Sequence, residues 1–228
     1  MGNSGFASVT VTARSLRDYC NMFGLDDADL TAGPVLDCPG GASSFGAEAR
    51  TRGARVVSVD PVYGLDQGEI VGRVQANLRA APRIFNDSGL PIDWDYLGSP
   101  FDYVGKSEAA LRQFGADRVR HPGWYVCAAL PWLPFADHSF RLVLSSHLLF
   151  IYHTTLGFGD HLAAILEMIR VSPEEVRIHP IVDATGAPYP RLAELREALN
   201  HHAVATQIRP ITRTWIIGAA QMLVCHRR

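Results

Sequence analysis

The chain has 228 residues, of which 47% are hydrophobic and 19% are charged, and its formal net charge is -2 at pH 7. It can bury one large apolar core, so we expect a single domain over residues 1–228. The near-neutral balance supplies no broad basic field, which argues against a nucleic-acid partner. The polar start and the absence of a long apolar run argue against a leader and a membrane partner, so we expect a cytoplasmic protein.

Strand-like and helix-like segments alternate along the chain. The first is an amphipathic helix at residues 15–25, with Leu16, Tyr19, Cys20 and Phe23 at helical spacing. We predict strands at 34–38, 55–60, 124–127, 140–145, 175–182, 204–209 and 221–226, and further helices at 44–52, 158–171 and 191–200. This alternation indicates a Rossmann-like α/β fold, a doubly wound and mainly parallel sheet that binds ligands beyond the carboxyl ends of its strands.

The connection at residues 61–123 is far longer than a minimal helix between two strands, so we expect it to be an insertion with structure of its own. It contains a helix-like stretch at 107–114. It also contains a group of aromatic residues: Phe85, Trp94, Tyr96, Phe101 and Tyr103. Because apolar pockets suit small molecules, we predict that the insertion forms a cap over a small-molecule site. The alternative is that the aromatic residues only dock the insertion on the sheet.

A glycine pair follows the first strand in VLDCPGGASSF, residues 35–45. Gly40 and Gly41 have no Cβ, so the backbone can approach a ligand closely there. Asp37 ends the first strand and Asp60 ends the second, where nucleotide-binding sheets place a carboxylate for ribose hydroxyls. Two alternatives stay open: the glycine turn is an ordinary helix entry, and Asp60 only caps the turn at Pro61.

The stretch LPFADHSFRLVL, residues 133–144, resembles the L-P-F-x-D-x-S-F-D-x-V block of class I S-adenosylmethionine-dependent methyltransferases. VLDCPGG resembles the glycine loop of that family, VSVD its ribose-binding strand end, and EMIRVSPEEVRI its step from the fourth helix into the fifth strand. The resemblance implies a seven-stranded sheet with an antiparallel last strand, here with a helical insertion between strands 2 and 3. It also implies S-adenosylmethionine as the cofactor.

The resemblance assigns cofactor-binding roles to individual residues. Asp37, Gly40 and Gly41 would surround the methionine and ribose, Asp60 would accept from the ribose hydroxyls, and adenine would lie on Ala129 and Leu130. Tyr19 and Phe23 would cover the cofactor, because an aromatic face attracts a sulfonium cation; plain helix packing is the alternative. The sequence departs from the family at four positions: Pro39 and Ser43 replace glycines, Ala129 replaces an acidic residue, and Arg141 replaces an aspartate.

Methyl transfer depends mainly on alignment of the reacting atoms, and a histidine of near-neutral pKa can serve as general base. We predict His147, which follows the fourth strand, as that base, with Tyr152 and His153 as weaker alternatives. Ser145, Ser146 and His147 stand where enzymes that methylate nucleic-acid bases carry Asp or Asn followed by Pro-Pro and an aromatic residue. This departure argues further against a nucleic-acid acceptor.

Histidine and cysteine positions bear on metal binding. His147, His153 and His161 lie near Asp160 in the sequence, and such residues build metal sites. Their spacing matches no metal signature, so we predict no metal and keep a metal site as a minority alternative. Four widely spaced cysteines match no metal or disulfide pattern and are interpreted as buried apolar residues: Cys20, Cys38, Cys127 and Cys225.

These observations predict an S-adenosylmethionine-dependent methyltransferase that acts on a small-molecule acceptor. The first alternative is a non-catalytic relative that uses its aromatic insertion to bind a partner protein. The second is a nicotinamide-dependent oxidoreductase, which is disfavoured because PGGASS is not the G-x-G-x-x-G turn.

Overall fold

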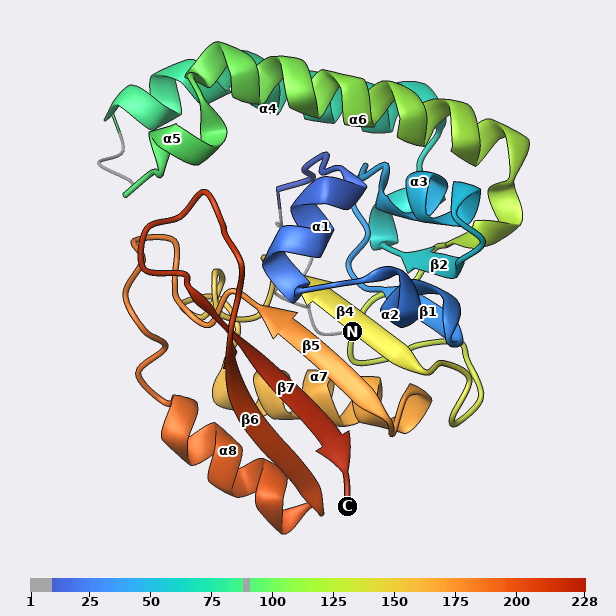
Figure 1. The fold of residues 1–228 in the computed structure, drawn as a ribbon, viewed down its shortest axis with the longest axis vertical. Coiled ribbons are helices and arrows are strands. Elements are labelled where there is room, and N and C mark those ends of the chain that lie inside the picture. Colours follow the sequence, from blue (N-terminus) through green and yellow to red (C-terminus); the bar gives the residue numbers. More distant parts are fainter. Residues whose placement is uncertain (1–9, 88–90) are drawn as a thin grey trace.

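The computed structural model describes residues 10–87 and 91–228, which form a seven-stranded sheet flanked by helices (Figure 1). Its strand order is β3-β2-β1-β4-β5-β7-β6. The strands are β1 (Pro34–Asp37), β2 (Arg55–Val59), β3 (Tyr125–Val126), β4 (Leu142–Ser146), β5 (Glu175–His179), β6 (Val204–Pro210) and β7 (Gln221–Arg227). β7 runs antiparallel to both β5 and β6, while the other pairs are parallel. The predicted mainly parallel sheet with an antiparallel last strand is therefore confirmed.

Helices cover both faces of the sheet. They are α1 (Leu16–Phe23), α2 (Asp27–Thr31), α3 (Phe45–Thr51), α4 (Gln67–Asp87), α5 (Trp94–Leu97), α6 (Pro100–Arg120), α7 (Phe158–Val171) and α8 (Leu192–His201), with short 3-10 turns at Pro61–Gly64 and Pro122–Trp124. α1 begins at a capping box formed by Ser15 and Asp18 and ends at Gly24, whose φ of 61° is the left-handed conformation that glycine adopts readily.

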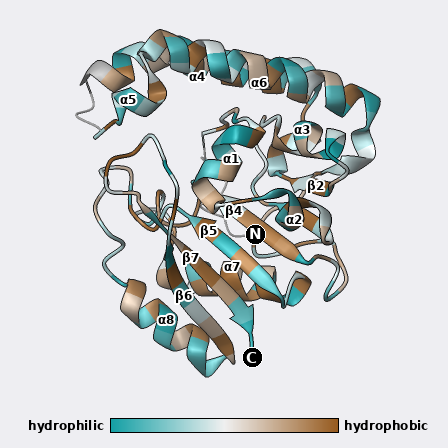
Figure 2. Cartoon of the chain, in the orientation of Figure 1, coloured by the Kyte–Doolittle hydropathy of each residue, from teal (hydrophilic) through white to brown (hydrophobic). Residues whose placement is uncertain are grey.

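The central strands are buried on both faces, which explains their continuous apolar sequences (Figure 2). Leu142 and Leu144 of β4 belong to the cluster that contains residues of α1 and α3. Val143, between them, belongs to the cluster that contains residues of α7 and α8. Because successive side chains of a strand point to opposite faces, one strand supplies both halves of the core.

The long connection between β2 and β3 folds into a helical hairpin, in which α4 and α6 lie side by side along one side of the molecule (Figure 1). α6 begins at a capping box formed by Ser99 and Asp102. Arg118 joins the hairpin to the sheet edge, since it donates to the carbonyls of Tyr63 and Leu65 at 2.8 and 3.0 Å. The helix predicted at 107–114 is the middle of α6, and α4 was not predicted.

The tip of the hairpin contacts residues 211–220, which connect β6 to β7. The backbone N–H of Asp93 donates to the carbonyl of Trp215 at 2.9 Å, and that of Ile217 donates to Pro91 at 2.7 Å. The ring of Phe85 lies edge-on to Trp215, with centroids 6.3 Å apart. The tip therefore holds the β6–β7 connection in place.

The aromatic residues of the insertion do not form the main cavity, so the predicted cap is corrected in its details. Phe85 packs against Trp94 and Tyr103, while Phe101 is 80% exposed. Tyr96 accepts a hydrogen bond from Asn21 and donates one to Asp18 on the N-terminal side. These contacts fit the docking alternative.

Several predicted boundaries differ by a few residues. The strand predicted at 175–182 ends at His179, because Pro180 has no N–H to donate to a sheet. The strand predicted at 124–127 pairs only over Tyr125–Val126. Within residues 10–87 and 91–228, no helix combines the length and the apolar character needed to cross a membrane. The start of the chain, on which the expected lack of a leader rests, lies outside the described residues.

Arg177 is a buried cation that ties the N-terminal helices to β5. Its guanidinium donates to both carboxylate oxygens of Asp29 at 2.9 and 2.8 Å, to Glu175 at 3.0 Å and to the carbonyl of Phe23 at 2.9 Å. Removal of one partner from such a network leaves uncompensated buried charge.

We expect Arg177→Met to lower the free energy of unfolding by ~3 kcal/mol in denaturant titrations, because Asp29 and Glu175 lose their shared partner. Arg191→Met removes an exposed pair with Glu194 and should cost far less, because solvent screens that pair. Equal losses in the two variants would contradict the role given to Arg177.

Candidate functional site

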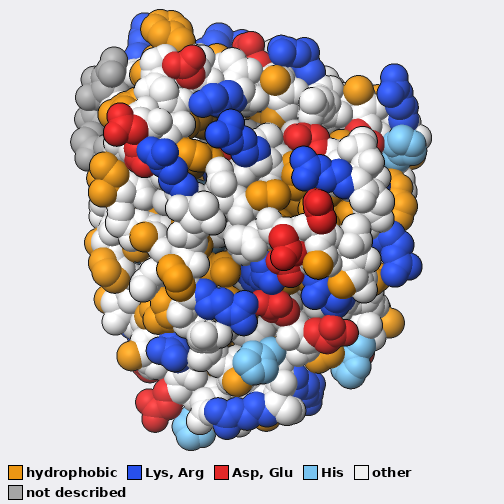
Figure 3. Space-filling view, in the orientation of Figure 1, with side chains coloured by type: hydrophobic (Ala, Val, Ile, Leu, Met, Phe, Trp, Pro, Cys, Tyr) orange, Lys and Arg blue, Asp and Glu red, His pale blue; other side chains and the backbone are white. Residues whose placement is uncertain are grey.

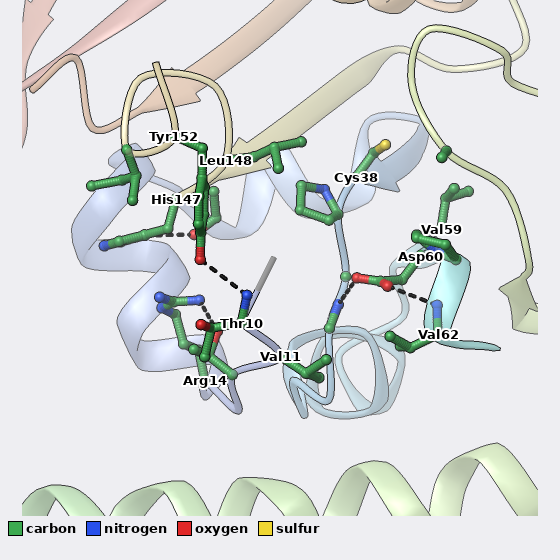
Figure 4. A pocket seen from close by; sticks show the side chains of 18 of the residues that line it. Thr10, Val11, Arg14, Cys38, Val59, Asp60, Val62, His147, Leu148 and Tyr152 are labelled. Atoms are coloured by element: carbon green, nitrogen blue, oxygen red, sulfur yellow. Dashed lines mark hydrogen bonds between the residues drawn. The ribbon is translucent and has the colours of Figure 1, made fainter. Parts of the chain in front are cut away.

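A cavity of about 380 Å³ opens at the carboxyl ends of β1, β2 and β4, a volume typical of small-molecule sites. Its walls come from the glycine loop after β1, the turn after β2, residues 128–130, and the loops after β4 and β5. Residues 10–14 and the β6–β7 connection complete them. Figure 4 shows Asp60 and His147 on opposite sides of this cavity. The predicted placement of the site beyond the strand ends agrees with this geometry.

Gly40 and Gly41 line the cavity, but their own protein surroundings demand glycine. A Cβ on Gly40 would overlap the Tyr63 hydroxyl and lie 2.8 Å from the Cβ of Ser58. Gly41 has a φ of 54°, and its Cβ would lie 2.8 Å from the carbonyl oxygen of Thr12. The glycine pair therefore lets the loop pack between the turn after β2 and the N-terminal segment.

Asp60 joins the glycine loop to the turn after β2, and its side chain lines the cavity. One carboxylate oxygen accepts from the backbone N–H of Gly41 at 2.9 Å, and the other accepts from Val62 at 3.0 Å. Burial raises the pKa of Asp60. The bond from Val62 caps the turn at Pro61, which is the alternative role that the sequence left open for Asp60. Each oxygen keeps a lone pair, so the carboxylate can also accept from ligand hydroxyls.

Asp37 and Tyr19, which the sequence predicts to bind the cofactor, are buried and are not among the residues that line the cavity. The Tyr19 hydroxyl donates to one oxygen of Asp37 at 2.8 Å, and the Ser58 hydroxyl donates to the other at 3.3 Å. Tyr19 also stacks on Phe45, with ring centroids 4.1 Å apart. Phe23 is fully buried in the same cluster. The amphipathic face of α1 is thus a core face, as the packing alternative stated.

Ala129 and Leu130 line the cavity on the side of Asp60, together with Val59 and Ala128. This wall is apolar, since Ala129 stands where the family often places an acidic residue. Arg141, another departure from the family pattern, does not line the cavity and lies 3.6 Å from Asp29. It joins β4 to α2.

His147 lies at the opposite side, directly after β4, and is 9% exposed. Its Nδ1 is 2.9 Å from the Ser146 hydroxyl, and its ring is parallel to Trp215 with centroids 5.8 Å apart. Nε2 has no partner among the described residues. Burial, together with the positive charge of Arg14 and the ring of His179, lowers the pKa of His147 well below its usual value. The imidazole is therefore neutral at pH 7.

The other candidate residues after β4 have structural partners. Tyr152 lines the cavity, and its hydroxyl accepts from the backbone N–H of Thr10 at 3.0 Å. His153 lies 3.5 Å from Asp183. The two ring nitrogens of His161 lie 2.8 and 3.0 Å from backbone carbonyls. Within the described part of the chain, no group of three or more His, Cys, Asp or Glu side chains is placed to hold a metal ion.

Sequence patterns did not reveal several residues that line the cavity. Arg14, Trp215 and Ile216 belong to no recognisable motif and come from opposite ends of the chain. Arg73 of α4 was also missed, because the glycines and Pro82 obscure the helical pattern there.

Comparison with known proteins places this geometry in context. No protein-family model matches the chain. An uncharacterized protein of Methanocaldococcus jannaschii is 28% identical over 177 residues, which cover 76% of this chain and 78% of that protein.

Three solved structures illustrate the similarity in fold. Magnesium protoporphyrin IX methyltransferase of Synechocystis PCC 6803 with bound SAM aligns at 14% identity over 89% of this chain and 73% of that chain, with a TM-score of 0.48. The O-methyltransferase NcsB1 from neocarzinostatin biosynthesis aligns at 14% identity over 90% and 51%, with a TM-score of 0.47. The [4+2]-cyclase SpnF aligns at 12% identity over 88% and 78%, with a TM-score of 0.44.

The chain forms a doubly wound, mainly parallel seven-stranded sheet. The strand order and the antiparallel β7 agree with the fold that the sequence resemblance implied. The glycine loop and the Asp60 strand end meet at the cavity, where the backbone N–H of Gly41 donates to Asp60.

The buried carboxyl of Asp37 should make stability depend on pH. Burial raises its pKa to about 7, so the folded state binds a proton more tightly than the unfolded state does. Between pH 4 and 8 we expect the free energy of unfolding of the wild type to fall by up to ~4 kcal/mol relative to Asp37→Asn, measured by denaturant titration. Parallel pH curves for the two proteins would contradict the raised pKa.

The ring of His147 should stay neutral in the folded protein. We expect its proton NMR resonance, assigned by comparison with His147→Gln, to show no protonation shift from pH 8 down to pH 6. The same residue in urea should titrate near pH ~6.5, the usual value. A folded-state midpoint near that value would rule out the desolvated ring.

Proposed function

We propose that this protein is an S-adenosylmethionine-dependent methyltransferase that acts on a small-molecule acceptor. The observation that carries the proposal is the position of Asp60, a carboxylate with free lone pairs bonded to the glycine loop at the cavity wall. This is the arrangement that recognises a ribose at the carboxyl edge of a doubly wound sheet.

The cavity offers a distinct surface for each part of the cofactor. Asp60 would accept from the two ribose hydroxyls, and the apolar wall of Ala129 and Leu130 would pack on adenine. The methionine part would lie along Gly40 and Gly41, which line the space between Asp60 and His147. The solved magnesium protoporphyrin IX methyltransferase structure contains SAM, which supports this choice of cofactor.

When bound, S-adenosylmethionine supplies a methyl group already activated on a sulfonium. The protein then needs mainly to align the acceptor and to exclude water. His147 is neutral, and its buried Nε2 has no hydrogen-bond partner among the described residues, so His147 would accept the proton that a hydroxyl or amine acceptor loses as it is methylated. Its low pKa makes it a weak base, which suits an acceptor that ionises readily.

The surroundings of the cavity favour a small acceptor over nucleic acid. On the face shown in Figure 3, basic and acidic side chains are interspersed. The cavity wall near His147 is apolar, with Leu148, Ile151 and Ile216. An apolar pocket with few polar groups is typical of small-molecule recognition.

Calorimetric titration tests the cofactor directly. We expect S-adenosylmethionine and S-adenosylhomocysteine to bind with micromolar affinity and NADH not to bind. Asp60→Asn should weaken both affinities by about 10- to 100-fold, because the amide replaces one carboxylate oxygen with a donor. Asp66→Asn is the matched control: this exposed residue caps the start of α4, and it should bind like the wild type.

Calorimetric results that contradict these expectations distinguish between the alternative functions. Absence of binding by both adenosyl compounds would overturn the enzyme assignment and favour a non-catalytic, partner-binding protein. Tight binding of NADH alone would favour an oxidoreductase. Unchanged affinity of Asp60→Asn would remove the ribose assignment but leave the cofactor in place.

A further inference from the structure

Arg14 places a positive charge in the cavity without a carboxylate partner. Its backbone is fixed on the glycine loop, since its N–H donates to the Ser43 hydroxyl at 3.3 Å and its carbonyl accepts from Ser44 at 2.9 Å. Its guanidinium donates to the Thr12 hydroxyl. Within residues 10–87 and 91–228, it forms no ion pair. The fixed backbone thus presents to the cavity a guanidinium that has no ion-pair partner among the described residues.

The charged groups of the cavity are divided between its two sides. Three charged residues line it: Arg14, Asp60 and Arg73. Asp60 accepts backbone bonds on the glycine-loop side, whereas Arg14 lies on the side of His147 and Tyr152 (Figure 4). Burial lowers the pKa values of His147 and His179, and the charge of Arg14 lowers them further, so its field reaches this side of the cavity. The same charge opposes the rise that burial causes in the pKa of Asp37. An anion placed there would be stabilised.

Several apolar residues line the same cavity as Arg14. Trp215 is parallel to the ring of His147, and Leu148, Ile151 and Ile216 also line the cavity. Arg14 and Trp215 also line a second, smaller cavity under the insertion, next to Tyr96. Arg14 therefore lies between the main cavity and a second space, which Asp18 and Lys106 also line.

From this arrangement we propose that the acceptor is an apolar molecule with a carboxylate or similar anionic group, and that Arg14 binds that group. The guanidinium positions the acceptor while its apolar body packs on Trp215 and Ile151. Arg14 is thus a specificity-determining residue. This inference rests on the proposed methyltransferase function, because it divides one cavity between a cofactor and an acceptor.

The α-carboxylate of the cofactor is a second source of the same chemistry, and the first experiment separates the two. S-adenosylhomocysteine has this carboxylate, whereas 5′-methylthioadenosine lacks the amino-acid part. We expect Arg14→Met to bind both compounds within about twofold of the wild type in calorimetric titrations. A loss of affinity for S-adenosylhomocysteine alone would assign Arg14 to the cofactor and overturn the proposal.

The second experiment probes the anion site with 1-naphthoate and its neutral isostere 1-naphthamide, added to protein saturated with S-adenosylhomocysteine. We expect the carboxylate to bind the wild type at least about tenfold more tightly than the amide, a preference worth a charge-assisted hydrogen bond. Arg14→Met should lose this preference and Arg14→Lys should keep part of it. Arg17→Met, an exposed arginine of α1, is the control that should keep all of it.

Equal binding of naphthoate and naphthamide by the wild type would overturn the proposal, as would an unchanged preference in Arg14→Met. Denaturant titration of Arg14→Met confirms that the variant folds. Failure of the wild type to bind S-adenosylhomocysteine would instead refute the proposed function. The naphthoate preference is then measured on the protein alone, so the two failures remain distinct.

Discussion

The buried contact between Tyr19 and Asp37 is the constraint on which the cavity depends. Asp37 ends β1, and Tyr19 and Ser58 bring hydroxyl donors to it from α1 and β2. Gly40 packs against the same Ser58 and leaves no room for a side chain. A carboxyl group without these donors would cost several kcal/mol in the core, so the sequence after β1 must fold over it in one way. The glycine loop packs on this buried contact and presents its backbone to the cavity.

Charge is distributed unevenly around the cavity. Asp60 contributes the carboxylate that lines one side, and its two backbone partners hold the loop and the turn together. Arg14 contributes a guanidinium on the other side, where His147 is kept neutral by burial and by that charge. The Asp60 side suits a ligand with hydroxyl donors, and the Arg14 side suits an anion. Two ligands can therefore be aligned between the two sides of the cavity.

The long insertion contributes to the site indirectly. Its tip bonds the backbone around Trp215, and Phe85 packs on the Trp215 ring, which in turn lies parallel to His147. The shape of the cavity near His147 thus depends on contacts between segments more than 100 residues apart in the chain. Changes in the insertion can alter the wall of the cavity although most of its aromatic residues do not line it.

The sequence by itself determined the strands, the core helix at 158–171, and those site residues that directly follow strands. Gly40, Asp60 and His147 line the cavity as expected, because parallel strands bring their carboxyl ends to one edge. Only the tertiary structure decided that Tyr19 faces the core and that Arg14 and Trp215 line the same two cavities. Periodicity reports which face of an element is apolar, but not what that face packs against. Contacts between distant loops produce no periodic pattern in the sequence, since each contact depends on how the whole chain has folded.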